Sequence, residues 1–222
     1  MSTLYVLATP IGNLEDLSQR ALRILAEVSA VAAEDTRLTG QLLTRHGLRK
    51  PLLSYRAPVE RRGLPRVLAA LAAGDVALVS DAGTPAVSDP GQQLVAASWR
   101  DGHTVVPLPG PSAVTTALSA AGFPGTGFSF VGYLPRKPGE LRRFFASLAE
   151  TRQPTVAFES PHRVLRSLSV LAETLPERPL LLARELTKLH EELRRGTAAR
   201  VLEELGGRAR GEFTLVISGS ES

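Results

Sequence analysis

The residues best suited to bind a ligand lie in a loop of small and polar residues, 80–91. The loop follows a short apolar run, Val76–Val79, which is typical of a buried strand. If that strand is parallel, Asp81, Gly83 and Thr84 lie just beyond its carboxyl end, where open α/β sheets bind ligands. Connections from strand to helix usually take about 2–6 residues, so a loop of this length favours a ligand site over a plain connection.

The end of this loop has the spacing of a helix start. Asp89 can cap a helix, Pro90 suits its first position, and Gln92 completes the spacing of a capping box. We therefore expect a helix from Pro90 onward, with Asp89 as its N-cap.

A second motif combines a carboxylate, an imidazole and a guanidinium. Ser160 has the position of a helix N-cap and Pro161 that of the first helical residue. Glu159 then ends a buried strand, and His162 and Arg163 lie in the first helical turn. An ion pair between Arg163 and Glu159, beside a surface histidine, is an equal alternative to a functional site.

Lys188 belongs to a third polar segment, 184–188, which also follows an apolar run. Its Arg184 and Glu185 can pair with each other. A pair of this kind is more often a structural or solvated ion pair than a catalytic one.

The elements that must position these residues alternate regularly in the first half of the chain. Amphipathic helices separate the apolar runs there, which predicts a mostly parallel sheet covered on both faces. Its strands are expected at 4–8, 30–33, 52–54, 76–79 and 105–108. Because the carboxyl ends of parallel strands share one edge, the polar segments 9–13, 34–37, 80–81 and 109–112 should gather there.

The second half has a different spacing. A helix over 112–121 ends at Gly122, and residues 123–127 read as a linker. Strands are expected at 129–133, 155–158, 180–183, 191–195 and 213–217, with helices at 139–149, 161–174 and 198–205. The paired late strands allow a mixed sheet. We predict two α/β domains, 1–117 and 118–222, with a ligand cleft between them.

Composition excludes several classes of chemistry. The chain has 222 residues and no cysteine, so disulfides, thiolate catalysis and zinc–thiolate sites are impossible. Neither a dinucleotide fingerprint nor a P-loop occurs, and the four histidines lack metal-ligand spacing, so no metal is expected. No apolar run is long enough to span a bilayer, and a cytoplasmic location is the default. The net charge of +4 is compatible with a polyanionic partner without requiring one.

The ordered motifs together resemble the tetrapyrrole-methylase superfamily, and within it the branch that methylates the ribose 2′-oxygen of a cytidine in 16S ribosomal RNA. The first-half motifs are 9–14, 33–37, 80–85, 89–91 and 107–111. The second-half motifs are 117–122, 159–163 and 183–187. The segment Thr9-Pro10-Ile11-Gly12-Asn13 favours the RNA branch, because tetrapyrrole-acting relatives carry a glycine-rich loop there.

The resemblance implies S-adenosylmethionine bound between two α/β domains, usually in a homodimer, and the small ribosomal subunit as partner. The cofactor contacts that it implies are Pro10, Asp81, Gly83, Thr84, Val87, Ser112, Ala113, Phe158, Ala183 and Phe213. Transfer to a ribose hydroxyl benefits from a general base. We take Glu159, His162 and Lys188 as the candidates, since all three follow strand ends.

Two departures bear on the substrate. The RNA branch commonly has a His-x-His-Asn-Glu stretch after the third strand, and of it segment 55–60 keeps only Glu60. Many relatives also continue past the last strand into a small helical extension, whereas this sequence ends at Ser222. A methyltransferase of a corrin precursor, one that acts on a protein side chain, and a non-catalytic RNA-binding module with this fold therefore remain alternatives.

Overall fold

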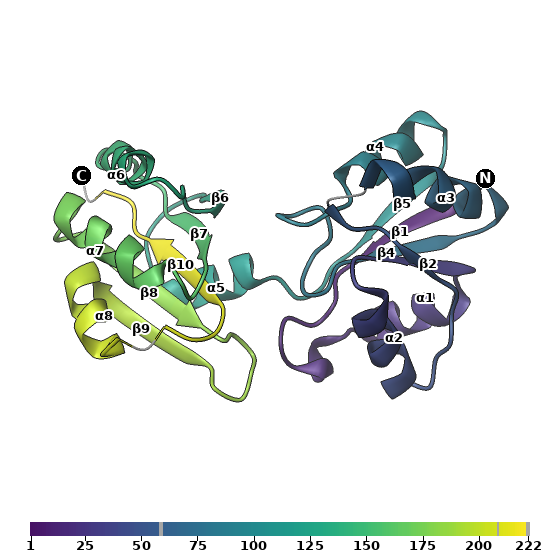
Figure 1. Ribbon diagram of the computed structural model, residues 1–222, viewed down its shortest axis with the longest axis horizontal. Coiled ribbons are helices and arrows are strands. Elements are labelled where there is room, and N and C mark those ends of the chain that lie inside the picture. Colours follow the sequence, from purple (N-terminus) through teal and green to yellow (C-terminus); the bar gives the residue numbers. More distant parts are fainter. Residues whose placement is uncertain (58–59, 208, 221–222) are drawn as a thin grey trace. The chain divides into compact units, whose positions relative to one another are not determined.

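The computed structural model describes residues 1–57, 60–207 and 209–220, and the chain divides into two compact units, Met1–Ser112 and Ala113–Ser222 (Figure 1). The boundary expected between residues 117 and 118 falls inside helix α5 (Ala113–Ala121), which the structure assigns whole to the second unit. Among the described residues, no helix is both long and apolar enough to cross a membrane.

The first unit is built on a five-stranded sheet in which every neighbouring pair is parallel, as predicted. Its order is β3-β2-β4-β1-β5, so β4 returns between β1 and β2. The strands are β1 (Thr3–Leu7), β2 (Ala30–Ala33), β3 (Leu52–Ser54), β4 (Val76–Val79) and β5 (Thr104–Leu108). Their carboxyl ends define one edge, from which the polar loops leave.

Helices cover both faces of this sheet, which explains why β4 is apolar at every position. Ala77 and Val79 pack in a cluster with residues of α1 and α2, whereas Val76 and Leu78 pack with residues of α3 and α4. The helices are α1 (Gln19–Glu27), α2 (Thr36–Arg45), α3 (Glu60–Ala73) and α4 (Gln92–Arg100), and a 3₁₀ turn, η1, spans Leu14–Asp16.

The second unit has a mixed sheet in the order β6-β7-β10-β8-β9. Only β6 and β7 are parallel, and the other neighbours are antiparallel. The strands are β6 (Ser129–Tyr133), β7 (Thr155–Glu159), β8 (Pro179–Arg184), β9 (Glu192–Thr197) and β10 (Phe213–Ile217). The ends of β7 and β8 therefore lie at the same edge as the start of β10.

Helices α6 (Pro138–Ser147), α7 (Val164–Thr174) and α8 (Ala198–Leu205) form one apolar cluster with alternate residues of the strands. On β10 these residues are Phe213, Leu215 and Ile217. Helix α5 packs against β7, β8 and β10, and its buried residues lie outside that cluster. The second sheet is thus also covered on both faces.

Candidate functional site

The loop that follows β4 is fastened to the loop that follows β1. The Thr9 N–H donates to the Gly83 carbonyl and the Gly83 N–H donates to the Thr9 carbonyl, both at 2.9 Å. The Thr9 hydroxyl also donates to the Ser80 carbonyl at 3.0 Å. Two of the predicted polar segments therefore form one structure at the carboxyl edge of the first sheet.

The loop after β5 joins the same structure through close backbone approach. The Thr84 hydroxyl donates to the Pro111 carbonyl at 3.3 Å. A Cβ on Gly110 would lie 2.9 Å from the Cβ of Ala8, so only glycine fits there without a shift. The three loops make a tightly closed backbone cradle.

The backbone of loop 80–91 is strained as well as closely packed. Ala86 and Ser88 have φ values of +67° and +63°, and Gly83 and Gly91 also have positive φ. Non-glycine residues rarely adopt such angles, and they cluster where a loop must hold one conformation for function.

The predicted helix start at Asp89 and Pro90 is wrong. Helix α4 begins at Gln92, and its N-cap is Gly91, which has no side chain to accept a hydrogen bond. Gln92 donates instead to the Ala86 carbonyl at 3.1 Å, and the Asp89 carboxyl interacts with Ser80. The two residues that looked like parts of a helix cap, Asp89 and Gln92, make hydrogen bonds within the loop instead.

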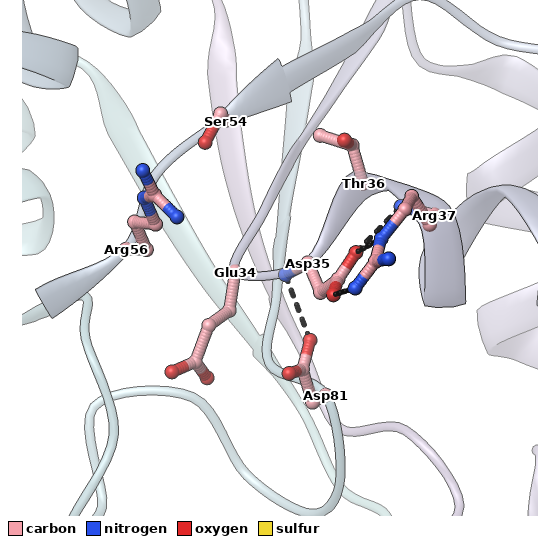
Figure 2. Close-up of a pocket in the computed structure, with 7 residues that line it drawn as sticks. All are labelled: Glu34, Asp35, Thr36, Arg37, Ser54, Arg56 and Asp81. Carbon is pink, nitrogen blue, oxygen red and sulfur yellow. Dashed lines mark hydrogen bonds and ion pairs between the residues drawn. The ribbon is translucent and has the colours of Figure 1, made fainter.

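A cavity of about 430 Å³ opens at the carboxyl ends of β2, β3 and β4 (Figure 2). The Asp81 carboxylate accepts a hydrogen bond from the Asp35 N–H at 2.8 Å and so connects loop 80–91 to the start of α2. Asp35 caps α2 through the Arg37 N–H and pairs with the Arg37 guanidinium at 2.8 Å. The lining residues are Glu34, Asp35, Thr36, Arg37, Ser54, Arg56 and Asp81.

The carboxyl groups of this cavity titrate differently. Hydrogen bonds from Arg37 lower the pKa of Asp35 to about 2. Burial, with the neighbouring charges of Asp81 and Asp89, raises the pKa of Glu34 above its usual value. Burial likewise raises the pKa of Asp89. Carboxylates gathered at one sheet edge favour a cationic group nearby.

Of the lining residues, only Asp81 was predicted as a site residue, and segment 34–37 was expected only to lie at this edge. Ser54 ends β3 and Arg56 comes shortly after it, so the shared carboxyl edge of the strands was the signal that could have found them. Of segment 55–60, residues 58 and 59 lie outside the described part of the chain, and the side chain of Glu60 is not described.

The other residues implied for the cofactor in the first half of the chain lie on or near these loops. Pro10 is buried beside Thr9, Val87 is 41% exposed, and Ser112 and Ala113 are partly exposed at the start of α5. The structure thus brings Pro10, Gly83 and Thr84 together with Asp81.

In the second unit, Glu159 is held by an ion pair, as the alternative interpretation proposed. The buried carboxylate of Glu159 accepts from the Ser160 N–H at 2.7 Å and from the Ser167 hydroxyl at 2.6 Å. The Arg163 guanidinium lies 2.5 Å from Oε1, the oxygen that also accepts from the Ser160 N–H, and it donates to the Leu134 carbonyl at 3.1 Å. Both oxygens of Glu159 therefore already accept hydrogen bonds.

The predicted helix cap at Ser160 is also wrong. Residues 161–163 form a turn, and α7 begins at Val164. The Ser160 carbonyl accepts from the Arg163 and Val164 N–H groups, both at 3.0 Å. His162 is exposed on this turn.

Lys188 lies in a loop after β8 and is held by two carboxylates. Its Nζ is 2.9 Å from Glu185 and 2.7 Å from Glu212. Burial alone would lower the pKa of Lys188, but these hydrogen bonds raise it. The ammonium is therefore charged at neutral pH and cannot accept a proton.

The remaining predicted residues occupy different faces of the second sheet. Phe213 is 2% exposed within the cluster under α6, α7 and α8. Phe158 and Ala183 lie outside that cluster, and Phe158 makes edge contacts with the rings of Phe130 and Tyr133. On the α5 face Phe158 is partly exposed to a ligand, whereas Ala183 is 1% exposed and the Phe213 side chain lies on the opposite face.

Comparison with known proteins adds a family model and close relatives. Residues 3–202 match the model described as Tetrapyrrole (Corrin/Porphyrin) Methylases. A Thermotoga maritima protein named ribosomal RNA small subunit methyltransferase I is 44% identical over 223 residues, which cover all of both chains. The Neisseria meningitidis (serogroup A) protein of the same name is 47% identical over 97% of this chain and 75% of its own length.

Solved structures share the fold at lower identity. The methyltransferase CobJ superposes with a TM-score of 0.72 at 20% identity, over 99% of this chain and 95% of that one. Uroporphyrin-III C-methyl transferase from Thermus thermophilus, complexed with S-adenosyl homocysteine, gives a TM-score of 0.65 at 20% identity, over 98% and 97%.

Proposed function

Because the chain belongs to the tetrapyrrole (corrin/porphyrin) methylase family, we propose that it transfers a methyl group from S-adenosylmethionine to the ribose 2′-oxygen of a cytidine in 16S ribosomal RNA. The observation that carries this proposal is the 44% identity, over the whole of both chains, to a relative named as a small-subunit ribosomal RNA methyltransferase. Five solved structures, among them uroporphyrin-III and cobalt-precorrin-4 methyltransferases, are 14–25% identical to this chain.

The loop structure of the first unit fits S-adenosylmethionine. Gly83 and Gly110 let backbone approach closely, and a Cβ at Gly110 would collide with Ala8. The exposed Asp81 and the half-buried Glu34 supply negative charge for a cofactor that carries a sulfonium and an ammonium group. When bound, this cofactor supplies an activated methyl group, so neither a metal nor a covalent enzyme intermediate is needed.

The first-unit contacts of this proposal are Pro10, Asp81, Gly83, Thr84, Val87 and Ser112, and Ala113 follows at the start of α5. Phe158 and Ala183, and the backbone of Phe213, are the contacts proposed in the second unit. Calorimetric titration of single variants with S-adenosylmethionine tests each contact.

The cavity beside the cofactor loop suits one acceptor nucleotide. Its volume of about 430 Å³ is within the range of about 300–1,000 Å³ that is usual for small-molecule sites. Arg56 offers a guanidinium for a phosphate, and Glu34 a carboxyl group that can accept from the amino group of cytosine. The proposed acceptor pocket thus lies directly beside Asp81, which the cavity and the cofactor loop share.

In the transfer, a bond forms between the ribose oxygen and the methyl carbon while the methyl–sulfur bond breaks, and the hydroxyl proton must leave. Among Glu159, His162 and Lys188, the geometry favours His162 as the proton acceptor. Both oxygens of Glu159 already accept hydrogen bonds inside a buried ion pair, and Lys188 is protonated. Glu159 then acts as a positioning residue that holds Arg163 and the turn bearing His162.

His162→Gln should lower single-turnover methylation by about 10²-fold or more, since general-base catalysis contributes about 10²–10⁴. The affinity for S-adenosylmethionine should not change. A loss of less than about tenfold would remove His162 as the base.

A ribosomal substrate also implies a cytoplasmic location, and both this and a homodimer belong to the proposal. Sedimentation equilibrium tests the dimer. The substrate class is tested by offering labelled S-adenosylmethionine with unmodified small subunits, naked 16S RNA and a corrinoid precursor in parallel. Label in the RNA supports the proposal, and label in the corrinoid alone refutes it.

A further inference from the structure

One surface of the second unit combines exposed aromatic rings with exposed cations. It extends from the edge strand β6 to the following helix α6 (Figure 1). Phe128 is 42% exposed and Tyr133 is 60% exposed. Arg136 and Lys137 are exposed on the connection that leads from β6 to α6. We call these four residues the β6–α6 surface.

Buried residues hold the backbone of this surface in place. Phe158 contacts the Tyr133 ring, with centroids 5.8 Å apart. The next residue, Leu134, is 1% exposed, donates its N–H to the Phe158 carbonyl and accepts from Arg163. The Tyr133 ring therefore starts from a fixed backbone, which reduces the conformational entropy lost when it stacks on a base.

The cations of this surface lie in a stretch without acidic residues. Residues 128–139 hold Arg136 and Lys137 and neither aspartate nor glutamate. Lys137 forms an ion pair with Glu140 in which both side chains are exposed. Such a pair is weak, so another anion can take the place of Glu140 beside Lys137.

We propose that the β6–α6 surface binds single-stranded RNA that flanks the acceptor nucleotide, an inference that rests on the proposed function. Aromatic rings stack on bases without regard to sequence, and interleaved cations follow the phosphates. A protein interface would favour neither this positive charge nor an exposed lysine, because lysine is depleted at such interfaces. The polyanion is therefore the occupant that matches the surface.

Two variants separate stacking from charge. Tyr133→Leu removes the ring and keeps apolar bulk, and Arg136→Ala with Lys137→Ala removes two cations. The matched control is Arg20→Ala with Arg49→Ala, which removes two exposed cations from the first unit. Binding of a fluorescent single-stranded RNA with the decoding-region sequence is measured by anisotropy between 50 and 200 mM salt.

Tyr133→Leu should weaken RNA binding by about tenfold. The Arg136/Lys137 variant should reduce the slope of log affinity against log salt by about 1.4, because each phosphate contact to a single strand contributes about 0.7. The control should leave the slope unchanged, and the Arg136/Lys137 variant should bind S-adenosylmethionine like the wild type.

The proposal is overturned if Tyr133→Leu binds RNA within twofold of the wild type, or if the cation variant and the control have equal slopes. It is also overturned if the variants dissociate a dimer at unchanged RNA affinity, because the surface would then join two copies. Methylation of small subunits by the wild type decides the proposed function separately. An active wild type whose variants bind RNA normally refutes the docking surface alone.

Discussion

At the scale of single residues, glycines and carboxyl groups decide the properties of the first unit's site. Gly110 permits the loop after β5 to touch Ala8, and Gly83 pairs with Thr9 across two loops. Around them, Glu34 and Asp89 have raised pKa values because they are partly buried near other carboxylates. Crowded negative charge costs stability, which is typical of sites kept for binding.

Gly110→Ala should destabilise the protein and weaken cofactor binding together. The new Cβ would lie 2.9 Å from the Cβ of Ala8, and overpacking of this kind costs about 1–3 kcal/mol. Urea unfolding and calorimetric titration with S-adenosylmethionine measure the two effects. Gly139→Ala on α6 is the control, since its nearest contact is the end of the Arg143 side chain at 3.9 Å. Normal affinity in Gly110→Ala would show that this close approach does not shape the site.

Glu34→Gln should stabilise the protein increasingly as the pH rises. The pKa of Glu34 is raised in the folded state by burial and by Asp81 and Asp89. The folded protein therefore binds this proton more tightly than the unfolded chain, and stability falls as pH rises from the unfolded pKa through the folded one. Glutamine removes that loss. Urea unfolding at a series of pH values from about 4 to about 7 should give diverging curves for the two proteins, whereas parallel curves would contradict the assignment.

At the scale of elements, most of the fold and part of the site could be predicted from the sequence. Strand–helix alternation predicted the parallel first sheet, and therefore that segments 9–13, 80–91 and 109–112 meet at one edge. The predicted starts of α4 and α7 were wrong. Asp89 and Ser160 are residue types that often cap helices, but each lies in a turn that precedes its helix. A local pattern cannot distinguish these uses.

Long-range pairs had no sequence signal at all. The hydrogen bonds of Glu159 with Ser167 and of Asp81 with the Asp35 N–H depend on how distant elements pack. The side of the second sheet on which Phe213 lies follows from the register of β10, which the spacing of apolar residues alone did not assign.

Gly91→Ala should lower stability, because the true N-cap of α4 has a φ of +138° and a Cβ there would lie 2.9 Å from the Leu78 side chain. We expect a loss of about 1–3 kcal/mol in the free energy of unfolding, measured with urea. Gly40→Ala within α2 is the control, since it meets only an ordinary contact at 3.5 Å. Equal stabilities of the two variants would mean that the loop relaxes without cost.

At the scale of the whole molecule, two α/β units carry distinct parts of the proposed chemistry. The first holds the cofactor loop and a cavity for the acceptor nucleotide, and the second holds His162 and the β6–α6 surface. The chain covers all of the Thermotoga relative and three quarters of the length of the Neisseria one. Relatives of both lengths therefore share the part described here.

The central claim is transfer to a ribose oxygen of 16S RNA, and mapping the methyl group tests it most directly. Unmodified small subunits are treated with the protein and S-adenosylmethionine, and their RNA is then divided into two portions. One portion is digested to nucleosides, and the other is left intact and copied by primer extension at low nucleotide concentration. We predict 2′-O-methylcytidine and one new strong stop in the decoding region, both absent without the cofactor. A methyl group on a base, or no methylated nucleoside in the RNA, would contradict the account.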